Sequence, residues 1–224
     1  MHAAHAGLCS AYVIRYVITK NDAEINSAET ACASGLAANS NLHMVYTALG
    51  DLYEQTGRLQ EGEAAYLQAI SFNEQDVQAM HGLASIYERQ QRLDEAIALL
   101  NEAIRLQPGN WRSASTLGGL LFSNGRFAEA ASAFEQVVAL NPNNQNGLGN
   151  LGSALLMTGD FNGAGEALRK SLNIQPDRDY FSNLAVIYYY QGQFDEAVEI
   201  NRTAVAEFPD QSSVWLNLGD ALVF

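Results

Sequence analysis

Lysine, long apolar runs and signal-peptide features are scarce or missing in this sequence of 224 residues. Lys20 and Lys170 are the only lysines, and 12 basic residues stand against 25 acidic ones. Because a nucleic-acid groove needs clustered lysine and arginine, we expect no nucleic-acid partner and no membrane partner. No apolar run approaches the roughly 20 residues that cross a bilayer, and the N-terminus lacks the basic start of a signal peptide.

Groups suited to catalysis or metal binding are equally sparse. The histidines are His2, His5, His43 and His81, and only the first two share a helix face, with no third ligand nearby. No glycine-rich phosphate loop and no pairing of a nucleophile with a base stands out. The sequence therefore predicts no metal, no cofactor and no enzymatic activity.

Cysteine occurs only at Cys9 and Cys32. We predict that both are free, buried thiols, and the alternative is a disulfide across an N-terminal helical hairpin. Two cysteines favour a reducing compartment or indifference to redox conditions. The predicted localisation is cytoplasmic, with the soluble part of a membrane-anchored parent protein as the alternative.

Proline is also rare, and its spacing is the most informative feature of the chain. The four prolines are Pro108, Pro142, Pro176 and Pro209, spaced 34, 34 and 33 residues apart. Proline ends a helix, so a breaker at this period predicts stacked helical repeats.

Other residue types recur in the same phase when repeats are counted from His43. Position 7 is always leucine: Leu49, Leu83, Leu117, Leu151, Leu184 and Leu218. Position 8 is always small: Gly50, Ala84, Gly118, Gly152, Ala185 and Gly219. Position 15 is Gly57, Gln91, Gly125, Gly159 and Gly192, and position 20 is Gly62, Ala96, Ala130, Ala164 and Ala197. Position 24 is Tyr66, Leu100, Phe134, Leu168 and Asn201.

Each position has a packing reason. Leucine at position 7 belongs to the apolar stripe of a first helix. The small residues at positions 8 and 20 let two helices of a hairpin approach closely, and the large residue at position 24 fills the layer between hairpins. Glycine at position 15 supplies the turn between the helices, where a positive φ is cheap.

Over residues 43–224 the chain resembles the tetratricopeptide repeat family, whose length and signature these positions match. The resemblance implies an all-α fold, a right-handed α-solenoid of stacked antiparallel helix hairpins. Two residues depart from the pattern: Glu74 replaces the terminal proline of the first repeat, and Asn201 occupies a usually apolar position.

The expected organisation has seven parts. Residues 1–42 form a degenerate N-terminal hairpin or cap, with a longer connection near residues 20–24. Five repeats follow at 43–76, 77–110, 111–144, 145–177 and 178–211, and residues 212–224 form the first helix of a truncated sixth repeat.

The resemblance also implies which residues line a concave groove, because first-helix positions 2, 5, 6, 9, 12 and 13 usually face it. Position 6 is asparagine in three successive repeats, and a carboxamide both donates and accepts. Similar ladders occur in peptide-gripping relatives; the alternative is that asparagine is simply common before Leu-Gly. Apolar side chains follow the same surface, although part of this stripe could pack on adjacent helices. The predicted peptide-binding residues are Asn150, Asn183, Asn217, Phe122, Leu156, Met157, Tyr189, Tyr190, Arg112 and Asn146.

These features predict a protein-interaction module that grips an extended, neutral to basic peptide. The net charge of −13 agrees with such a ligand, or it only keeps the chain soluble.

The chain also resembles C-terminal repeat regions of bacterial serine/threonine kinases, nucleotide cyclases and winged-helix regulators, which implies a scaffold or sensory segment of a larger signalling protein. The alternatives are an oligomerisation module, with a homodimer through the C-terminal helix around Trp215, Leu218 and Leu222, or the substrate-recruiting arm of an enzyme.

Overall fold

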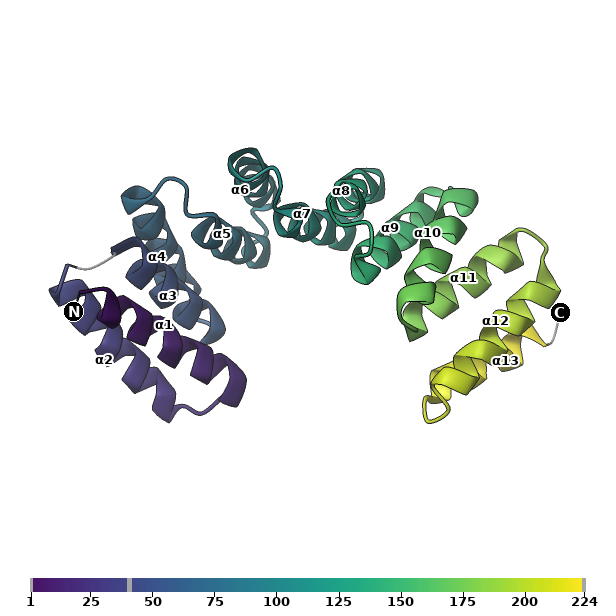
Figure 1. Cartoon of the computed structure of the whole chain (residues 1–224), viewed down its shortest axis with the longest axis horizontal. Helices are drawn as coiled ribbons and strands as arrows, with labels where there is room; N and C mark the ends of the chain where they lie inside the picture. Colours follow the sequence, from purple (N-terminus) through teal and green to yellow (C-terminus); the bar gives the residue numbers. More distant parts are fainter. Residues whose placement is uncertain (1, 40–41, 223–224) are drawn as a thin grey trace. The chain divides into compact units, whose positions relative to one another are not determined.

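A computed structural model describes residues 2–39 and 42–222, with side chains from residue 6 onward. The described residues form thirteen α-helices and no strand (Figure 1). The chain divides into two compact units, unit 1 (Met1–Pro108) and unit 2 (Gly109–Phe224). Unit 1 contains α1 (His2–Thr19), α2 (Ala23–Ala37), α3 (Leu42–Gln55), α4 (Leu59–Phe72), α5 (Val77–Arg89) and α6 (Leu93–Leu106). Unit 2 contains α7 (Trp111–Ser123), α8 (Phe127–Leu140), α9 (Gln145–Thr158), α10 (Phe161–Ile174), α11 (Arg178–Tyr190), α12 (Phe194–Glu207) and α13 (Ser212–Ala221).

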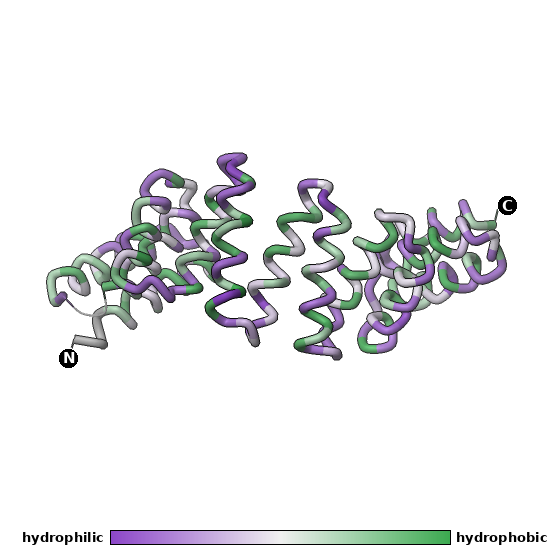
Figure 2. Tube along the Cα trace, turned by 90° about the horizontal axis from the view of Figure 1, so that it is seen from above, coloured by the Kyte–Doolittle hydropathy of each residue, from purple (hydrophilic) through white to green (hydrophobic). Residues whose placement is uncertain are grey.

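Within each unit the helices pair in chain order as hairpins, α1 with α2 through α11 with α12, and α13 packs on α12. Hydrophobic and hydrophilic residues alternate along the helices (Figure 2), as expected when each helix buries one stripe. The predicted all-α solenoid of helical hairpins is therefore confirmed.

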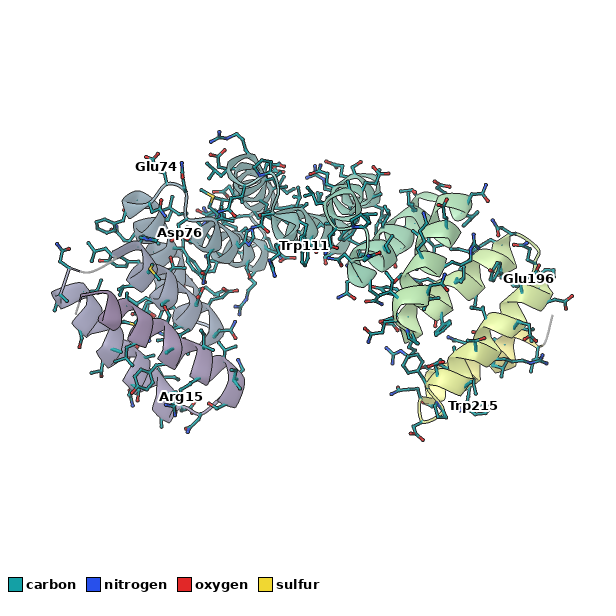
Figure 3. The ribbon with its side chains drawn as sticks, viewed as in Figure 1. Arg15, Glu74, Asp76, Trp111, Glu196 and Trp215 are labelled. Carbon is teal, nitrogen blue, oxygen red and sulfur yellow. A yellow bond between two sulfur atoms is a disulfide. The ribbon has the colours of Figure 1, made fainter. Side chains whose placement is uncertain are left out.

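The prolines lie where the period predicted. Each comes two residues after the end of a second helix: α6 ends at Leu106, α8 at Leu140, α10 at Ile174 and α12 at Glu207. After the first three prolines the next helix starts behind an Asn or Asp cap, at Asn110, Asn144 and Asp177, whereas α13 follows Gln211 without a side-chain cap. The junction that lacks a proline is capped as well, at Asp76, where Oδ1 accepts from the backbone N of Ala79 at 3.1 Å (Figure 3). At the Pro108, Pro142 and Pro176 junctions a proline thus follows one helix and a capping side chain opens the next.

The small residues at position 8 lie under the large residues at position 24. A Cβ added to Gly50 would be 2.5 Å from the Tyr66 ring, and one added to Gly118 would be 2.6 Å from Phe134. Tyr66 and Phe134 are fully buried. The absence of a side chain at position 8 thus creates the space that the aromatic ring of the second helix fills.

The turns within hairpins use the left-handed backbone region. Gly57, Gly125, Gly159 and Gly192 have φ between 73° and 86°. In the first of these turns the backbone N of Arg58 donates to the carbonyl O of Tyr53 at 2.7 Å, which satisfies the end of α3. Gln91 occupies the same position of the second repeat with φ 62°, a conformation that costs a residue with a Cβ about 1 kcal/mol.

Replacing Gln91 with glycine is therefore expected to stabilise unit 1 by about 0.5–1 kcal/mol, because glycine adopts positive φ freely. Urea unfolding followed by circular dichroism measures the change. The matched control is Gly57→Gln, which places the same side chain in the equivalent turn and should destabilise by a similar amount. An unchanged midpoint in Gln91→Gly would contradict the assigned strain.

The N-terminal hairpin differs from prediction in two ways. Cys9 and Cys32 form a disulfide with a Cα–Cα distance of 4.7 Å, so the prediction of free thiols is wrong. Small buried residues on both helices, Ala6, Ala28 and Ala31, let α1 and α2 approach closely and bring the cysteines within bonding range. The connection between the helices is residues 20–22, no longer than the 56–58 connection of the next hairpin.

Candidate functional site

The three asparagines at position 6 lie on successive first helices of unit 2. The Nδ2 of Asn183 on α11 donates to the Ser153 hydroxyl on α9 at 2.9 Å, and the Nδ2 of Asn217 on α13 donates to the Ser182 hydroxyl on α11 at 2.8 Å. Asn150 instead accepts through Oδ1 from the Tyr180 hydroxyl at 3.1 Å. We call the surface that these helices form with α7 the inner face of unit 2.

Each carboxamide therefore keeps one polar group that makes no hydrogen bond within the described part of the chain. For Asn183 and Asn217 this group is the accepting Oδ1, and for Asn150 it is the donating Nδ2. One half of each amide ties neighbouring hairpins together, and the other half is chemically able to pair with a peptide backbone.

A first hollow of about 390 Å³ lies beside Asn150 and Asn183, between α7, α9 and α11. Its lining includes Phe122, Ser153 and Tyr180 together with the carboxylates of Asp177 and Asp179. Burial raises the pKa of Tyr180 to about 12, so its hydroxyl stays protonated and donates to Asn150 at neutral pH. The hollow combines an aromatic wall with acidic groups, which suits an apolar or basic side chain.

A second hollow of about 230 Å³ lies between α11, α12 and α13, beside Asn217. Its walls are mainly apolar, with Val186, Tyr189 and Phe194, and Asn201 and Asp220 also line it. The Tyr189 ring meets Phe194 edge-on with centroids 5.5 Å apart, which holds one wall in place.

The predicted apolar residues divide into exposed and packed ones. Met157 and Tyr190 are more than half exposed, at 54% and 66%, although Tyr190 also stacks on Phe161 with centroids 5.3 Å apart. Phe122 is half-buried and meets Phe127 edge-on at 5.2 Å. Leu156 packs against the buried cluster around Leu168, so it belongs in large part to the layer between hairpins.

The two predicted polar residues outside the asparagine row are exposed. The Arg112 guanidinium lies 4.9 Å from the centroid of the Trp111 ring, and Asn146 lies in the first turn of α9. Neither lines the first or the second hollow.

One family model of the tetratricopeptide repeat matches residues 47–110 and 183–223, and a second model of the same repeat matches residues 121–187. The chain belongs to the tetratricopeptide repeat family. These repeats are protein-interaction modules, generally without enzymatic activity, and the matches indicate no catalytic family. Comparison with curated proteins gave no match.

Solved structures of tetratricopeptide repeat type share the fold at low identity. PilF of Pseudomonas aeruginosa is 15% identical with a TM-score of 0.72, and the match covers 98% of this chain and 99% of PilF. MamA is 21% identical with a TM-score of 0.69, over 77% of this chain and 95% of MamA. YrrB, described as a tetratricopeptide repeat protein with an unusual peptide-binding site, is 21% identical with a TM-score of 0.68, over 82% and 95%. At these identities the likeness shows the fold alone.

Sequence reasoning missed a half-buried acidic cluster in the tetratricopeptide repeats of unit 1. The Tyr66 hydroxyl lies 2.7 Å from Asp51 Oδ1 and 3.1 Å from Glu54 Oε2. Gln78 donates to Asp51 at 3.1 Å, and Ser85 donates to Glu54 at 2.6 Å. The sequence did contain a signal for this cluster: Asp51 and Glu54 are three residues apart on a first helix, in the repeat that carries a tyrosine, Tyr66, at position 24.

Asp51 gives unit 1 a defined pH dependence. Burial, reinforced by the nearby carboxylates of Glu54 and Asp76, raises its pKa to about 6. A raised pKa means that the folded state favours the protonated acid, so the stability contributed by this group is present at low pH. It is lost as the pH rises from about 4, where the unfolded chain ionises, to about 6.

Asp51→Asn removes this ionisation while keeping an oxygen that can accept from Tyr66. At pH 7.5 the variant is expected to be more stable than the wild type by about 1–2 kcal/mol, and the difference should close as the pH falls to about 4. Urea unfolding at four pH values measures it, with the exposed Asp94→Asn as the control. A difference that does not change with pH would contradict the assignment.

Metal and membrane features are absent from the part of the chain that the structure describes. There, no three His, Cys, Asp or Glu side chains gather as a metal site, and the side chains of His2 and His5 lie outside the described residues. Among the described helices none combines the length and the apolar character needed to cross a membrane.

Proposed function

We propose that unit 2 binds an extended segment of a partner protein along its inner face. The observation that carries the proposal is the row Asn150, Asn183 and Asn217, which borders two hollows and keeps one unpaired polar group on each amide in the described residues. A peptide backbone offers donors and acceptors in alternation, so the row can hold it whatever its side chains.

The hollows define the proposed ligand further. Phe122 in the first hollow and Tyr189 in the second offer aromatic surface, and Met157 and Tyr190 are exposed. Leu156, Arg112 and Asn146 complete the proposed site at its edges. Asp177, Asp179 and Asp220 line the hollows and no lysine or arginine does, so the proposed peptide is neutral to basic. YrrB, with its described peptide-binding site, supports the same mode by analogy of fold.

The test selects peptides that bind the 224-residue chain from a random display library and measures their affinity by calorimetry. The variant Asn150→Ala/Asn183→Ala/Asn217→Ala should bind the selected peptides about 100-fold more weakly, because three hydrogen bonds of about 1 kcal/mol each are lost. Circular dichroism and the thermal midpoint check that the variant retains its helices, since all three asparagines also tie neighbouring hairpins together.

The matched control is Gln136→Ala/Asn162→Ala/Asn173→Ala, which removes three exposed carboxamides from the second helices α8 and α10. This control should bind as the wild type does. Equal affinities for the wild type and the position 6 variant would overturn the proposed row.

A second candidate function is self-association through α13. Trp215 and Leu216 are 53% and 65% exposed on this helix, and the Trp215 indole N donates to the carbonyl O of Pro209 at 2.9 Å, which fixes the ring (Figure 3). Exposed apolar groups that cluster favour a contact surface. Light scattering of the full chain should then show a dimer that Leu216→Glu dissociates, and a monomer at high concentration would overturn this candidate.

The wider setting is also proposed. The repeat boundaries, and a scaffold or sensory role in a larger bacterial signalling protein, rest on the sequence pattern. For localisation, the Cys9–Cys32 disulfide argues against a reducing cytoplasm, because structural disulfides persist in oxidising compartments. A thiol count on protein isolated under alkylating conditions tests this.

A further inference from the structure

The second hollow lies at a junction between hairpins where three side chains are smaller than those at the preceding junction. Where the α9–α10 hairpin meets α11, the layer is filled by Leu168, Tyr180 and Ile187, all buried. Where the α11–α12 hairpin meets α13, the same repeat positions carry Asn201, Val214 and Ala221. Each is smaller than its counterpart, and Asn201 and Ala221 line the space of about 230 Å³ that remains.

The donors of Asn201, Asn217 and Ser182, which line this hollow, are already engaged. Asn201 is 3% exposed, and its Nδ2 donates to the carbonyl O of Ala197 at 3.0 Å. Asn217 donates to the Ser182 hydroxyl, which in turn donates to the carbonyl O of Arg178 at 3.1 Å. The two carboxamides therefore offer an occupant of the hollow only their acceptor oxygens.

The Oδ1 of Asn201 is the acceptor of greatest interest. In the described part of the chain it has no hydrogen-bond partner, and no fully buried side-chain polar atom there lacks one. This oxygen is therefore accessible, and the accessible space beside it is the hollow that Asn201 lines. The site thus places the Asn201 oxygen, with that of Asn217 as a second neutral acceptor, beside the apolar walls of Ala185, Val186 and Phe194.

We infer that the second hollow is a specificity pocket for an aromatic side chain that carries one neutral hydrogen-bond donor, the phenol of tyrosine or the indole of tryptophan. The ring occupies the apolar walls, and its O–H or N–H donates to Asn201 Oδ1. The inference deepens the proposed function, because it assigns one class of side chain, an aromatic ring with a neutral donor, to the peptide that the inner face binds.

A cationic side chain fits less well at this depth. An ammonium needs a carboxylate or a full set of acceptors once it is desolvated, and its burial beside neutral amide oxygens alone is costly. Asp220, the carboxylate of the pocket, is itself exposed and stays hydrated. A purely apolar ring would leave the Asn201 oxygen desolvated and without a partner, which is also unfavourable.

The test titrates the full chain with p-cresol, toluene and n-butylammonium, and follows the Asn201 side-chain amide and the backbone amides of Ala197 and Ala221 by NMR. We expect p-cresol to shift these signals and to bind about fivefold more tightly than toluene, the equivalent of one hydrogen bond. Equal binding of p-cresol and toluene, tighter binding of n-butylammonium, or no shift with any probe would each overturn the inference.

Two variants fill the pocket from opposite sides. Asn201→Leu restores the large apolar residue of position 24, and Ala221→Leu fills the space from α13. Both should lose p-cresol binding at least tenfold while the helices remain intact, and Asn162→Leu on the exposed face of α10 should bind as the wild type does. Retained binding in either folded filling variant would place the probe elsewhere and overturn the inference.

The small probes separate this inference from the proposed function. They need no peptide and no contact with Asn150 or Asn183, so a failed p-cresol titration leaves the peptide result standing. Conversely, p-cresol binding that Asn201→Leu abolishes would support the pocket even if the position 6 variant bound peptides normally.

Discussion

Gly82→Ala is expected to lower the free energy of unfolding of unit 1 by about 2–3 kcal/mol, although alanine is the better helix former by about 1 kcal/mol. A Cβ at Gly82 would lie 2.1 Å from Cζ and 2.3 Å from the hydroxyl O of Tyr66. The ring cannot move aside, because it packs directly on Gly50 of α3, where an added Cβ would lie only 2.5 Å from the ring. Its hydroxyl is also held by Asp51 and Glu54. Urea unfolding measures the loss.

Two further variants separate the clash from a general effect of alanine. Gly119 is also helical but has nothing within 4 Å of its added Cβ, so Gly119→Ala should stabilise unit 2 by about 0.5–1 kcal/mol. Combining Gly82→Ala with Tyr66→Leu removes the ring that clashes and should recover part of the loss. If Gly82→Ala were as harmless as Gly119→Ala, the packing of Tyr66 between α3 and α5 would be wrong.

Removing the Cys9–Cys32 disulfide is expected to cost the N-terminal hairpin about 3 kcal/mol, the value for a closed loop of this length. The two residues are 23 apart in the sequence. Besides the disulfide, the contacts of the hairpin include the packing of α1 and α2 on each other and on α3, the Arg15–Glu24 ion pair at 2.7 Å and the Arg58–Glu29 ion pair at 2.6 Å. In Cys9→Ala/Cys32→Ala the amides of α1 and α2 should therefore exchange hydrogen about 100-fold faster.

A reductant provides the control for this prediction. It should speed exchange in α1 and α2 of the wild type and leave the double variant unchanged. The amides of α9 and α10, which lie in unit 2, should not respond in either protein. Exchange in α1 and α2 that ignores both the substitution and the reductant would contradict a stabilising role for the disulfide.

Features that repeat along the chain could be predicted from the sequence. The prolines predicted the ends of second helices, and glycine at position 15 predicted the positive-φ turns. The small residue at position 8 predicted the place where the large residue at position 24 packs. Each of these depends on the local backbone or on a contact that recurs in every repeat. The repeat period therefore predicts such features directly. Even Gln91, the one residue at position 15 that is not glycine, adopts the positive φ of the glycines at that position.

Contacts that occur once could not be predicted in the same way. The proximity of Cys9 and Cys32 depends on how closely α1 and α2 approach, and composition alone favoured free thiols. The engagement of Asn150 by Tyr180, thirty residues away, depends on a ring long enough to cross between hairpins. Leu156 counted as an inner residue by position, yet it packs largely into the layer between hairpins.

The sequence by itself determined the repeat fold, its turns and the face on which the first helices line up, because these follow from residue type at a fixed period. The tertiary structure decided which polar groups on that face remain for a partner, and where a layer stays unfilled. The second hollow shows the reason. Asn201 and Ala221 lie on two different helices and are individually ordinary, and only their meeting at one junction leaves the cavity that both line.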